Sequence, residues 1–195
     1  RFALCRPDRL RRQRHRRVAG QRVGDHRDAA LARRDLLVDV NALARTLRGR
    51  QGELLQPGRC LLPADLAARI LEHARAELPN EACGLVGGDP STRRAVSFHP
   101  ARNRHASPLR YDIHSEDLVR IVFTIEAAGE ELLAVFHSHP RSAAVPSPTD
   151  VREARYEAVH LIATLADPGG DAADALRGWL VKDGAVSEVA IRISA

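Results

Sequence analysis

Residues 136–140 read Phe-His-Ser-His-Pro, and their two histidines come directly after the apolar run of residues 132–136. A run this short and apolar, ending in polar residues, is typical of a buried strand. Because successive side chains on a strand point to opposite faces, His137 and His139 are expected to share one face. The sequence therefore predicts two imidazoles that project together at the end of a strand.

A second polar segment, Pro-Ser-Pro-Thr-Asp, follows at residues 146–150. Its structural explanation is a helix start, with Ser147 at the N-cap, proline at the first helical position and Asp150 three residues after the cap. A helix start is also a rigid place from which to present a carboxylate. Two imidazoles and a carboxylate form a three-ligand set for zinc that leaves a fourth position open, as catalytic zinc sites do. We therefore take His137, His139 and Asp150 as the candidate metal ligands.

These residues stand at a specific spacing, with Ser147 eight positions after His139 and Asp150 three further on. Upstream, the segment Pro-Asn-Glu-Ala-Cys-Gly-Leu-Val-Gly-Gly at residues 79–88 is expected to place Glu81 at the start of a strand. Together the segments resemble the signature of the JAMM metalloproteases, which belong to the wider MPN (Mov34/PAD-1) group. In that family an upstream glutamate also enters the site on a strand.

The resemblance covers roughly residues 61–193 and is closest to the small bacterial members, which release adducts from the C-terminus of ubiquitin-like sulfur-carrier proteins. It implies an α/β fold of the MPN type, which is cytidine-deaminase-like, with a curved mixed sheet flanked by helices. It also implies a zinc metallopeptidase that hydrolyses the amide or isopeptide bond after the C-terminal Gly-Gly of a ubiquitin-like or sulfur-carrier protein. A carrier with a C-terminal cysteine is the preferred substrate, and its tail is expected to add as a strand to an exposed sheet edge.

The roles of the individual residues follow from zinc chemistry. Zinc held by three protein ligands lowers the pKa of its bound water from about 16 toward ~7. Glu81 is expected to accept a proton from that water and pass it to the departing amine. The Ser147 hydroxyl is expected to share the stabilisation of the oxyanion with the zinc. Ser138 points to the opposite strand face and is expected to support the loop or to make a hydrogen bond behind the ligand residues, while Cys83 is expected to be a small buried hydrophobe.

Three other functions stay open. One is a different zinc amide hydrolase on the same scaffold. Another is the RadC-like branch, which shares the His-x-His and Ser-x-x-Asp spacing. The Glu-Ala-Cys-Gly and His-Ser-His sequences argue against that branch. The third is a non-catalytic MPN scaffold, a binding module without metal; such members usually lose ligands, whereas every expected position is filled here.

The remaining segments predict a mixed sheet with helices packed on it. Helices are expected at residues 63–78, 115–128 and 148–156, from apolar periodicity and N-terminal signals such as Ser115. Strands are expected at residues 81–88, 95–100, 109–113, 132–138, 160–165, 176–181 and 186–193, the last two forming a hairpin around Asp183-Gly184. The histidines without partner spacing are expected at the surface or its boundary: His73, His99, His105, His114 and His160.

Charge divides the chain into two parts. Residues 1–60 carry 16 Arg and 6 Asp and Glu, whereas the remaining 135 residues carry 14 Lys and Arg and 19 Asp and Glu. The chain has no methionine, and 29 of its 30 basic residues are arginine. We interpret residues 1–60 as an Arg-rich extension that is disordered or is translated from upstream of the true start of a GC-rich gene, and residues 61–195 as the catalytic domain. With one aromatic residue in the extension, a nucleic-acid-binding arm is disfavoured.

Cysteine usage and hydropathy favour a cytoplasmic protein. The cysteines at positions 5, 60 and 83 are odd in number and far apart, which argues against a disulfide framework or a cysteine-based zinc site. No stretch approaches the ~18 consecutive apolar residues of a membrane span. The start lacks the charged-then-apolar pattern of an export signal.

Overall fold

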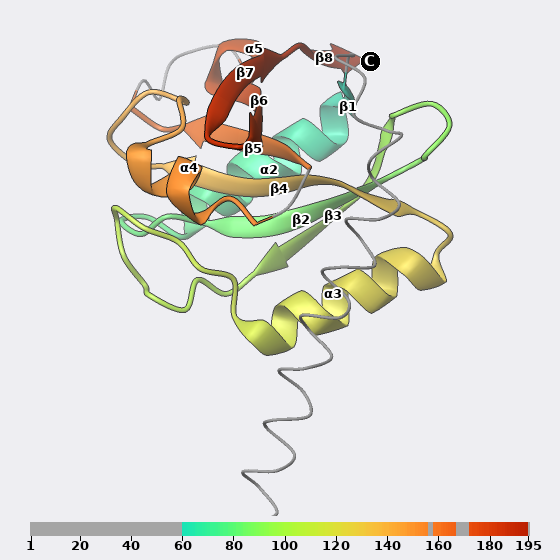
Figure 1. Cartoon of the computed structure of the whole chain (residues 1–195), viewed down its shortest axis with the longest axis horizontal. Coiled ribbons are helices and arrows are strands. Elements are labelled where there is room, and N and C mark those ends of the chain that lie inside the picture. Colours follow the sequence, from blue (N-terminus) through green and yellow to red (C-terminus); the bar gives the residue numbers. More distant parts are fainter. Residues whose placement is uncertain (1–59, 156–157, 167–171, 195) are drawn as a thin grey trace, which may run out of the picture. The chain divides into compact units, whose positions relative to one another are not determined.

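The computed structural model describes residues 60–155, 158–166 and 172–194. Its centre is a six-stranded sheet in the order β3-β2-β4-β5-β6-β7 (Figure 1). Strands β4 and β5 are parallel, and the other neighbours are antiparallel. The strands are β2 (Cys83–Gly88), β3 (Ala95–Ala101), β4 (Glu131–His139), β5 (Val159–Thr164), β6 (Leu176–Lys182) and β7 (Ala185–Val189). The predicted mixed sheet is confirmed, with the histidine strand β4 at its centre.

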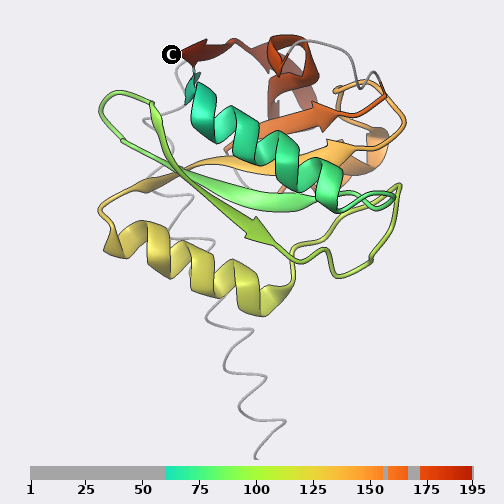
Figure 2. The ribbon, with the colours of Figure 1, turned by 180° about the vertical axis from the view of Figure 1, so that it is seen from behind.

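Helices cover both faces of this sheet (Figures 1 and 2). Helix α2 (Ala64–Ala76) packs on one face and α3 (Ser115–Ala127) on the other. Two short helices, α4 (Pro148–Glu153) and α5 (Ala172–Ala175), complete the described helices. A separate parallel pair joins β1 (Cys60–Pro63) to β8 (Ile191–Ser194). None of the described helices is both long enough and apolar enough to cross a membrane.

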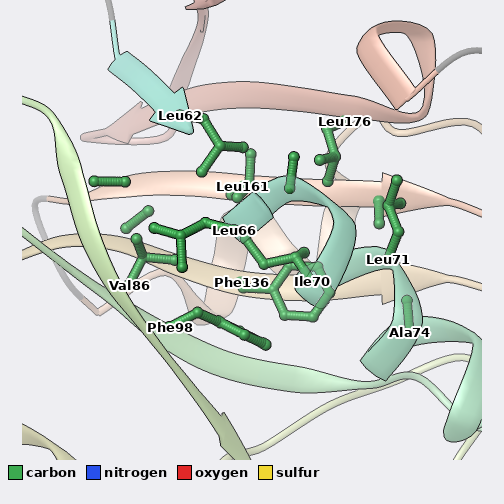
Figure 3. Close-up of a cluster of buried hydrophobic side chains, with 14 of the residues drawn as sticks. Leu62, Leu66, Ile70, Leu71, Ala74, Val86, Phe98, Phe136, Leu161 and Leu176 are labelled. Atoms are coloured by element: carbon green, nitrogen blue, oxygen red, sulfur yellow. The ribbon is translucent and has the colours of Figure 1, made fainter. Parts of the chain in front are cut away.

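The larger core lies between α2 and the sheet (Figure 3). Leu66 and Ile70 of α2 pack in one cluster with Phe136 of β4, and Phe98 of β3 meets the Phe136 ring edge-on. Full burial of one such side chain contributes about 1.5–3 kcal/mol. Because Phe136 faces α2, its neighbours in β4 face the other way, and this alternation fixes the direction in which His137 points.

The structure differs from the sequence-based expectation at residues 109–113, which form a loop rather than a strand. The side chain of Asn103 fills the role that a partner strand would have. Its amide donates to the carbonyl oxygens of Glu81 and Arg110, each at 3.0 Å. Its carbonyl accepts from the backbone N–H of His105 at 3.0 Å and of Asp112 at 3.2 Å. The backbone of this loop is therefore satisfied jointly by the Asn103 side chain and by an isolated antiparallel bridge between Asn103 and Ile113, in which the Arg104 N–H donates to the Asp112 carbonyl at 2.8 Å and the His114 N–H to the Arg102 carbonyl at 3.0 Å.

Other expectations are corrected by packing. Ser115 is the first residue of α3 and not its cap, because His114 occupies the cap position without a capping side-chain bond. His160 is buried inside β5 rather than near the surface. The predicted strand 186–193 is split, since its last residues leave the sheet and pair with β1, which the sequence did not predict.

The hairpin of β6 and β7 is confirmed. Asp183 and Gly184 both have positive φ values, 51° and 79°, as a two-residue type I′ turn requires. The predicted boundary at residue 61 falls inside β1, whose first residue is Cys60. Residues 1–59 lie outside the described part of the chain, so the interpretation of the extension stays a prediction.

One ion-pair network ties the loop of residues 102–114 to α3. The buried Asp117 carboxylate accepts from the backbone N–H of Arg102 at 3.0 Å and from its Nε at 2.8 Å, and Arg120 adds a third donor at 3.3 Å. Hydrogen bonds from the Arg102 side chain hold the pKa of Asp117 well below its usual range, against the opposing effect of burial.

Replacing Asp117 by Asn is expected to lower the free energy of unfolding by about 1–2 kcal/mol at pH 7, because charge-assisted hydrogen bonds are lost. The loss is modest because the Arg102 side chain is largely exposed and solvent screens the ion pair. Since the folded-state pKa is depressed, the stabilisation is complete above the unfolded pKa near ~4 and is lost as the pH falls below it. Urea unfolding at pH 7 and at pH 3 measures this. Glu72→Gln, on the exposed side of α2, is the control, and a D117N deficit independent of pH would contradict the assignment.

Candidate metal centre

The centre lies at the carboxyl end of β4, on the face opposite the α2 core. In the antiparallel pairing of β2 with β4, Cys83 lies opposite His137. The N–H of Ser138 donates to the carbonyl of Ala82 at 3.0 Å, which continues this register by one residue. One further step sets Glu81 opposite His139, and directly opposed residues share a face.

Three predicted ligand residues come together here. The Nε2 atoms of His137 and His139 are 3.1 Å apart. Oδ1 of Asp150 lies 3.6 Å from Nε2 of His137, and Oδ2 lies 3.5 Å from Nε2 of His139. One ligand atom from each residue can be chosen so that all lie within 4.8 Å of one another. Among the described residues this is the only such group of His, Cys, Asp or Glu side chains.

The carboxylate of Asp150 is fixed by the start of α4. The Ser147 side chain accepts from the Asp150 N–H at 3.2 Å, and the Ser147 N–H donates to Oδ2 of Asp150 at 2.7 Å. This reciprocal capping box stands at the N-terminus of α4, a helix of six residues. The two explanations of this segment are therefore compatible, because the same carboxylate caps the helix and faces the imidazoles.

The orientation of the His139 ring is set by a hydrogen bond on its Nδ1 side, away from the other ligand residues. Its Nδ1 lies 2.7 Å from the carbonyl oxygen of Ala143. Because a carbonyl can only accept, Nδ1 carries the hydrogen and the neutral ring keeps its free lone pair on Nε2. That lone pair points to the shared space between the three residues. Metal-ligating histidines commonly have such a second hydrogen bond.

His137 is held differently. It is fully buried, and the Tyr111 ring stacks on its imidazole with centroids 4.3 Å apart and an angle of 14°. No described residue gives its buried Nδ1 atom a hydrogen-bond partner. Burial lowers the pKa of His137 and so favours the neutral ring that can act as a ligand.

Charge in the site is distributed unevenly. Burial alone raises the pKa of Asp150, but hydrogen bonds from the two histidines outweigh it and hold that pKa well below its usual range. Burial lowers the pKa of His139, yet its contacts with Asp150 give a net increase. The site therefore keeps one ionised carboxylate against two imidazole nitrogens, a donor set that fits a divalent cation such as zinc.

Glu81 lies outside the ligand group but inside the same electrostatic environment. Its side chain is 5% exposed. Burial, followed by repulsion from Asp150, raises its pKa to about 7, although His139 acts in the opposite direction. Its backbone is fixed at both ends, by donation to the Ser107 carbonyl at 2.8 Å and by acceptance from Asn103. A carboxyl with a pKa near neutrality can both accept and donate a proton at pH 7.

The neighbouring residues confirm two expectations and add two new features. Ser138 is buried, and its hydroxyl accepts from the Ala82 N–H at 2.9 Å, so that it holds the segment before β2 rather than the loop after His139. Cys83 is buried, as expected. Asn103 and Tyr111 were not among the candidate site residues, yet Asn103 donates to the Glu81 carbonyl and Tyr111 stacks on His137. No spacing rule in the sequence connects them to the histidines.

Comparison with known proteins agrees with this geometry. The family described as prokaryotic homologs of the JAB domain matches residues 63–179, which contain all five predicted site residues. A desampylase from Haloferax volcanii is 39% identical over 103 residues, which are 50% of this chain and 74% of the relative. A CysO-cysteine peptidase from Mycobacterium tuberculosis is 31% identical over 134 residues, which are 68% of this chain and 90% of the relative.

A solved structure shares the fold of this chain. The solution structure of a protein from Desulfitobacterium hafniense is 31% identical, has a TM-score of 0.63, and covers 69% of this chain and 92% of its own. The expected resemblance to the JAMM/MPN metalloproteases is thus confirmed, and the chain belongs to the family of prokaryotic homologs of the JAB domain.

Proposed function

We propose that this chain is a zinc metallopeptidase that hydrolyses the amide or isopeptide bond after the C-terminal Gly-Gly of a ubiquitin-like or sulfur-carrier protein. The observation that carries the proposal is the convergence of His137, His139 and Asp150 beside the buried carboxyl of Glu81. We assign the activity to residues 61–195 together with Cys60, which belongs to β1. The reduced, buried thiols of Cys60 and Cys83 support a cytoplasmic location.

The names of the relatives support the choice of substrate. The mycobacterial relative is named as a peptidase for CysO-cysteine, and the haloarchaeal relative as a desampylase. We infer that the substrate is a carrier protein with a small adduct, such as cysteine, on its C-terminus. Glycine residues have no side chains, so a Gly-Gly tail suits an approach to a metal centre that is largely buried.

In this mechanism His137, His139 and Asp150 hold the zinc ion. When bound, zinc would supply Lewis acidity toward the scissile carbonyl and make a water acidic enough to attack near neutral pH. As the water oxygen bonds to the carbonyl carbon, the Glu81 carboxylate accepts a proton from that water. The same carboxyl then gives that proton to the amine as the carbon–nitrogen bond breaks. Net consumption is one water, and Glu81 returns to its starting state.

In this proposal Ser147 contributes a hydrogen bond to the oxyanion. Its oxygen already accepts from the Asp150 N–H, so the hydroxyl hydrogen is free to point elsewhere. A donor held rigidly at a helix start requires little reorganisation when negative charge develops. The Ser147 hydroxyl therefore acts as a preorganised donor toward the carbonyl oxygen of the substrate.

The purified chain is expected to bind one equivalent of zinc, and His139→Ala or Asp150→Ala is expected to lose it, because two remaining ligands do not hold the ion tightly. Elemental analysis after dialysis measures the stoichiometry. His105→Ala, on the exposed loop, is the matched control. Absence of stoichiometric zinc in the unaltered chain would favour a non-catalytic scaffold.

Glu81→Gln is expected to retain zinc but to lose hydrolysis by about 10²- to 10⁴-fold, because the amide cannot accept the proton. Release of the adduct from Gly-Gly-tailed carriers, followed by mass spectrometry, gives the rate. Glu72→Gln serves as the control for a neutralised glutamate. Undiminished turnover in E81Q would remove Glu81 from its role, and turnover of none of the carriers by the unaltered chain would remove the substrate assignment.

Ser147→Ala is expected to lower kcat by about 10²- to 10³-fold through loss of the oxyanion donor. It also removes the cap of α4, which costs about 1 kcal/mol of stability. Ser147→Thr keeps both the hydroxyl and the cap and is expected to stay active. Measuring kcat together with thermal unfolding separates the two effects; a normal kcat in S147A would show that the hydroxyl has only a capping function.

A further inference from the structure

The loop that follows His139, residues 140–146, is anchored to the neighbouring strands by side chains outside the metal centre. We call it the site loop. The Thr164 hydroxyl of β5 donates to the carbonyl of Ser142 at 2.8 Å. The Trp179 indole N–H of β6 donates to the carbonyl of Ala144 at 2.8 Å. Ala143, whose carbonyl accepts from His139 Nδ1, lies between these two anchored residues.

The Trp179 side chain is itself held on several sides. It is 9% exposed and forms an apolar cluster with Ala144 and Ile162. The Arg177 guanidinium lies 4.7 Å from the centre of its ring and is paired with Glu188 at 2.9 Å. The indole therefore has little freedom to move away from the site loop.

The sheet register places this anchor next to the metal centre. Ile162 of β5 lies directly beside His137 of β4, and Thr164 beside His139. His160, two residues before Ile162, lies opposite Trp179. All these side chains share one sheet face, and the site loop passes over it between the histidines and the indole.

We propose that Trp179, assisted by Thr164, is a positioning residue of the metal centre. The two donors fix the 142–143 peptide and the 144–145 peptide, which flank the peptide that carries the Ala143 carbonyl. That carbonyl in turn holds the His139 ring in the tautomer and orientation that present Nε2 to the metal. The inference rests on the proposed zinc site. The bond from His139 ends on a loop carbonyl rather than on a regular strand or helix, so that carbonyl is only as well placed as the loop.

Metal affinity is therefore expected to depend on Trp179 and Thr164, although neither residue binds the metal. Loss of the group that orients a metal-ligating histidine typically weakens metal binding by 10- to 100-fold. Trp179 acts one step further away, and its loss is expected to give the lower end of this range, about tenfold. If the indole served only to fill the core, Trp179→Phe would leave zinc affinity unchanged, because phenylalanine keeps an aromatic ring and lacks only the donor.

The test compares metal binding in four variants of the full chain. Thr164→Val removes one donor with little change of shape, Trp179→Phe removes the other donor and leaves a smaller ring, and Thr164→Ser retains the hydroxyl. Ile125→Val, on the buried side of α3, is the control for general destabilisation. Zinc affinity is measured by competition with a chromophoric chelator, the Co²⁺-loaded chain by its visible absorption spectrum, and the metal-free chain by thermal unfolding.

W179F and T164V are expected to bind zinc about tenfold more weakly and to alter the Co²⁺ spectrum, whereas T164S resembles the unaltered chain. I125V is expected to unfold at a lower temperature with unchanged affinity and spectrum. Unaltered affinity and spectrum in both W179F and T164V would overturn the inference, as would an equal loss of affinity in I125V. If the unaltered chain bound no zinc, the zinc site and this inference would fall together; if it bound zinc but cleaved no carrier, only the substrate assignment would fall.

Discussion

Two imidazole nitrogens and one carboxylate share a space from which water is largely excluded, and the rest of the structure depends on keeping them there. Polar groups in such a place are costly unless each has a partner. Here the partners are one another, with Nε2 atoms 3.1 Å apart and the Asp150 oxygens 3.5 and 3.6 Å away. Their mutual pairing is also what suits them to a divalent ion, because lone pairs from three residues already point to a common position.

The surrounding elements can be understood as supports for this arrangement. Strand β4 supplies both histidines because its other face is locked into the α2 core by Phe136. The cap of α4 supplies the carboxylate, and the segment before β2 supplies Glu81 through the continued register with β4. The site loop adds the carbonyl of Ala143, anchored in turn by β5 and β6. One strand, one helix start, one loop and the segment before β2 thus contribute to one small volume.

Several features could be predicted because their signals are local. The period of two in His-Ser-His, the cap pattern before Asp150 and the Asp-Gly turn each reflect a conformational preference of a few consecutive residues. Residues 109–113 show the limit of such reasoning. Their alternation resembles a strand, but only a single antiparallel bridge forms, between Asn103 and Ile113, and the Asn103 side chain makes further bonds to the backbone of Arg110 and Asp112. The burial of His160 could not be predicted either, because a strand covered on both faces has no polar side to reveal which residues face inward.

Local sequence was enough to predict the residue types of the metal centre, their strand and helix-start contexts and, through their spacing, the family. The folded structure was needed to show that Glu81 lies opposite His139, which partner orients each imidazole, and that Tyr111, Asn103 and Trp179 hold the site in place. The physical reason is that these contacts join segments tens of residues apart, and their geometry follows from strand register and core packing. No short stretch of the chain contains that information.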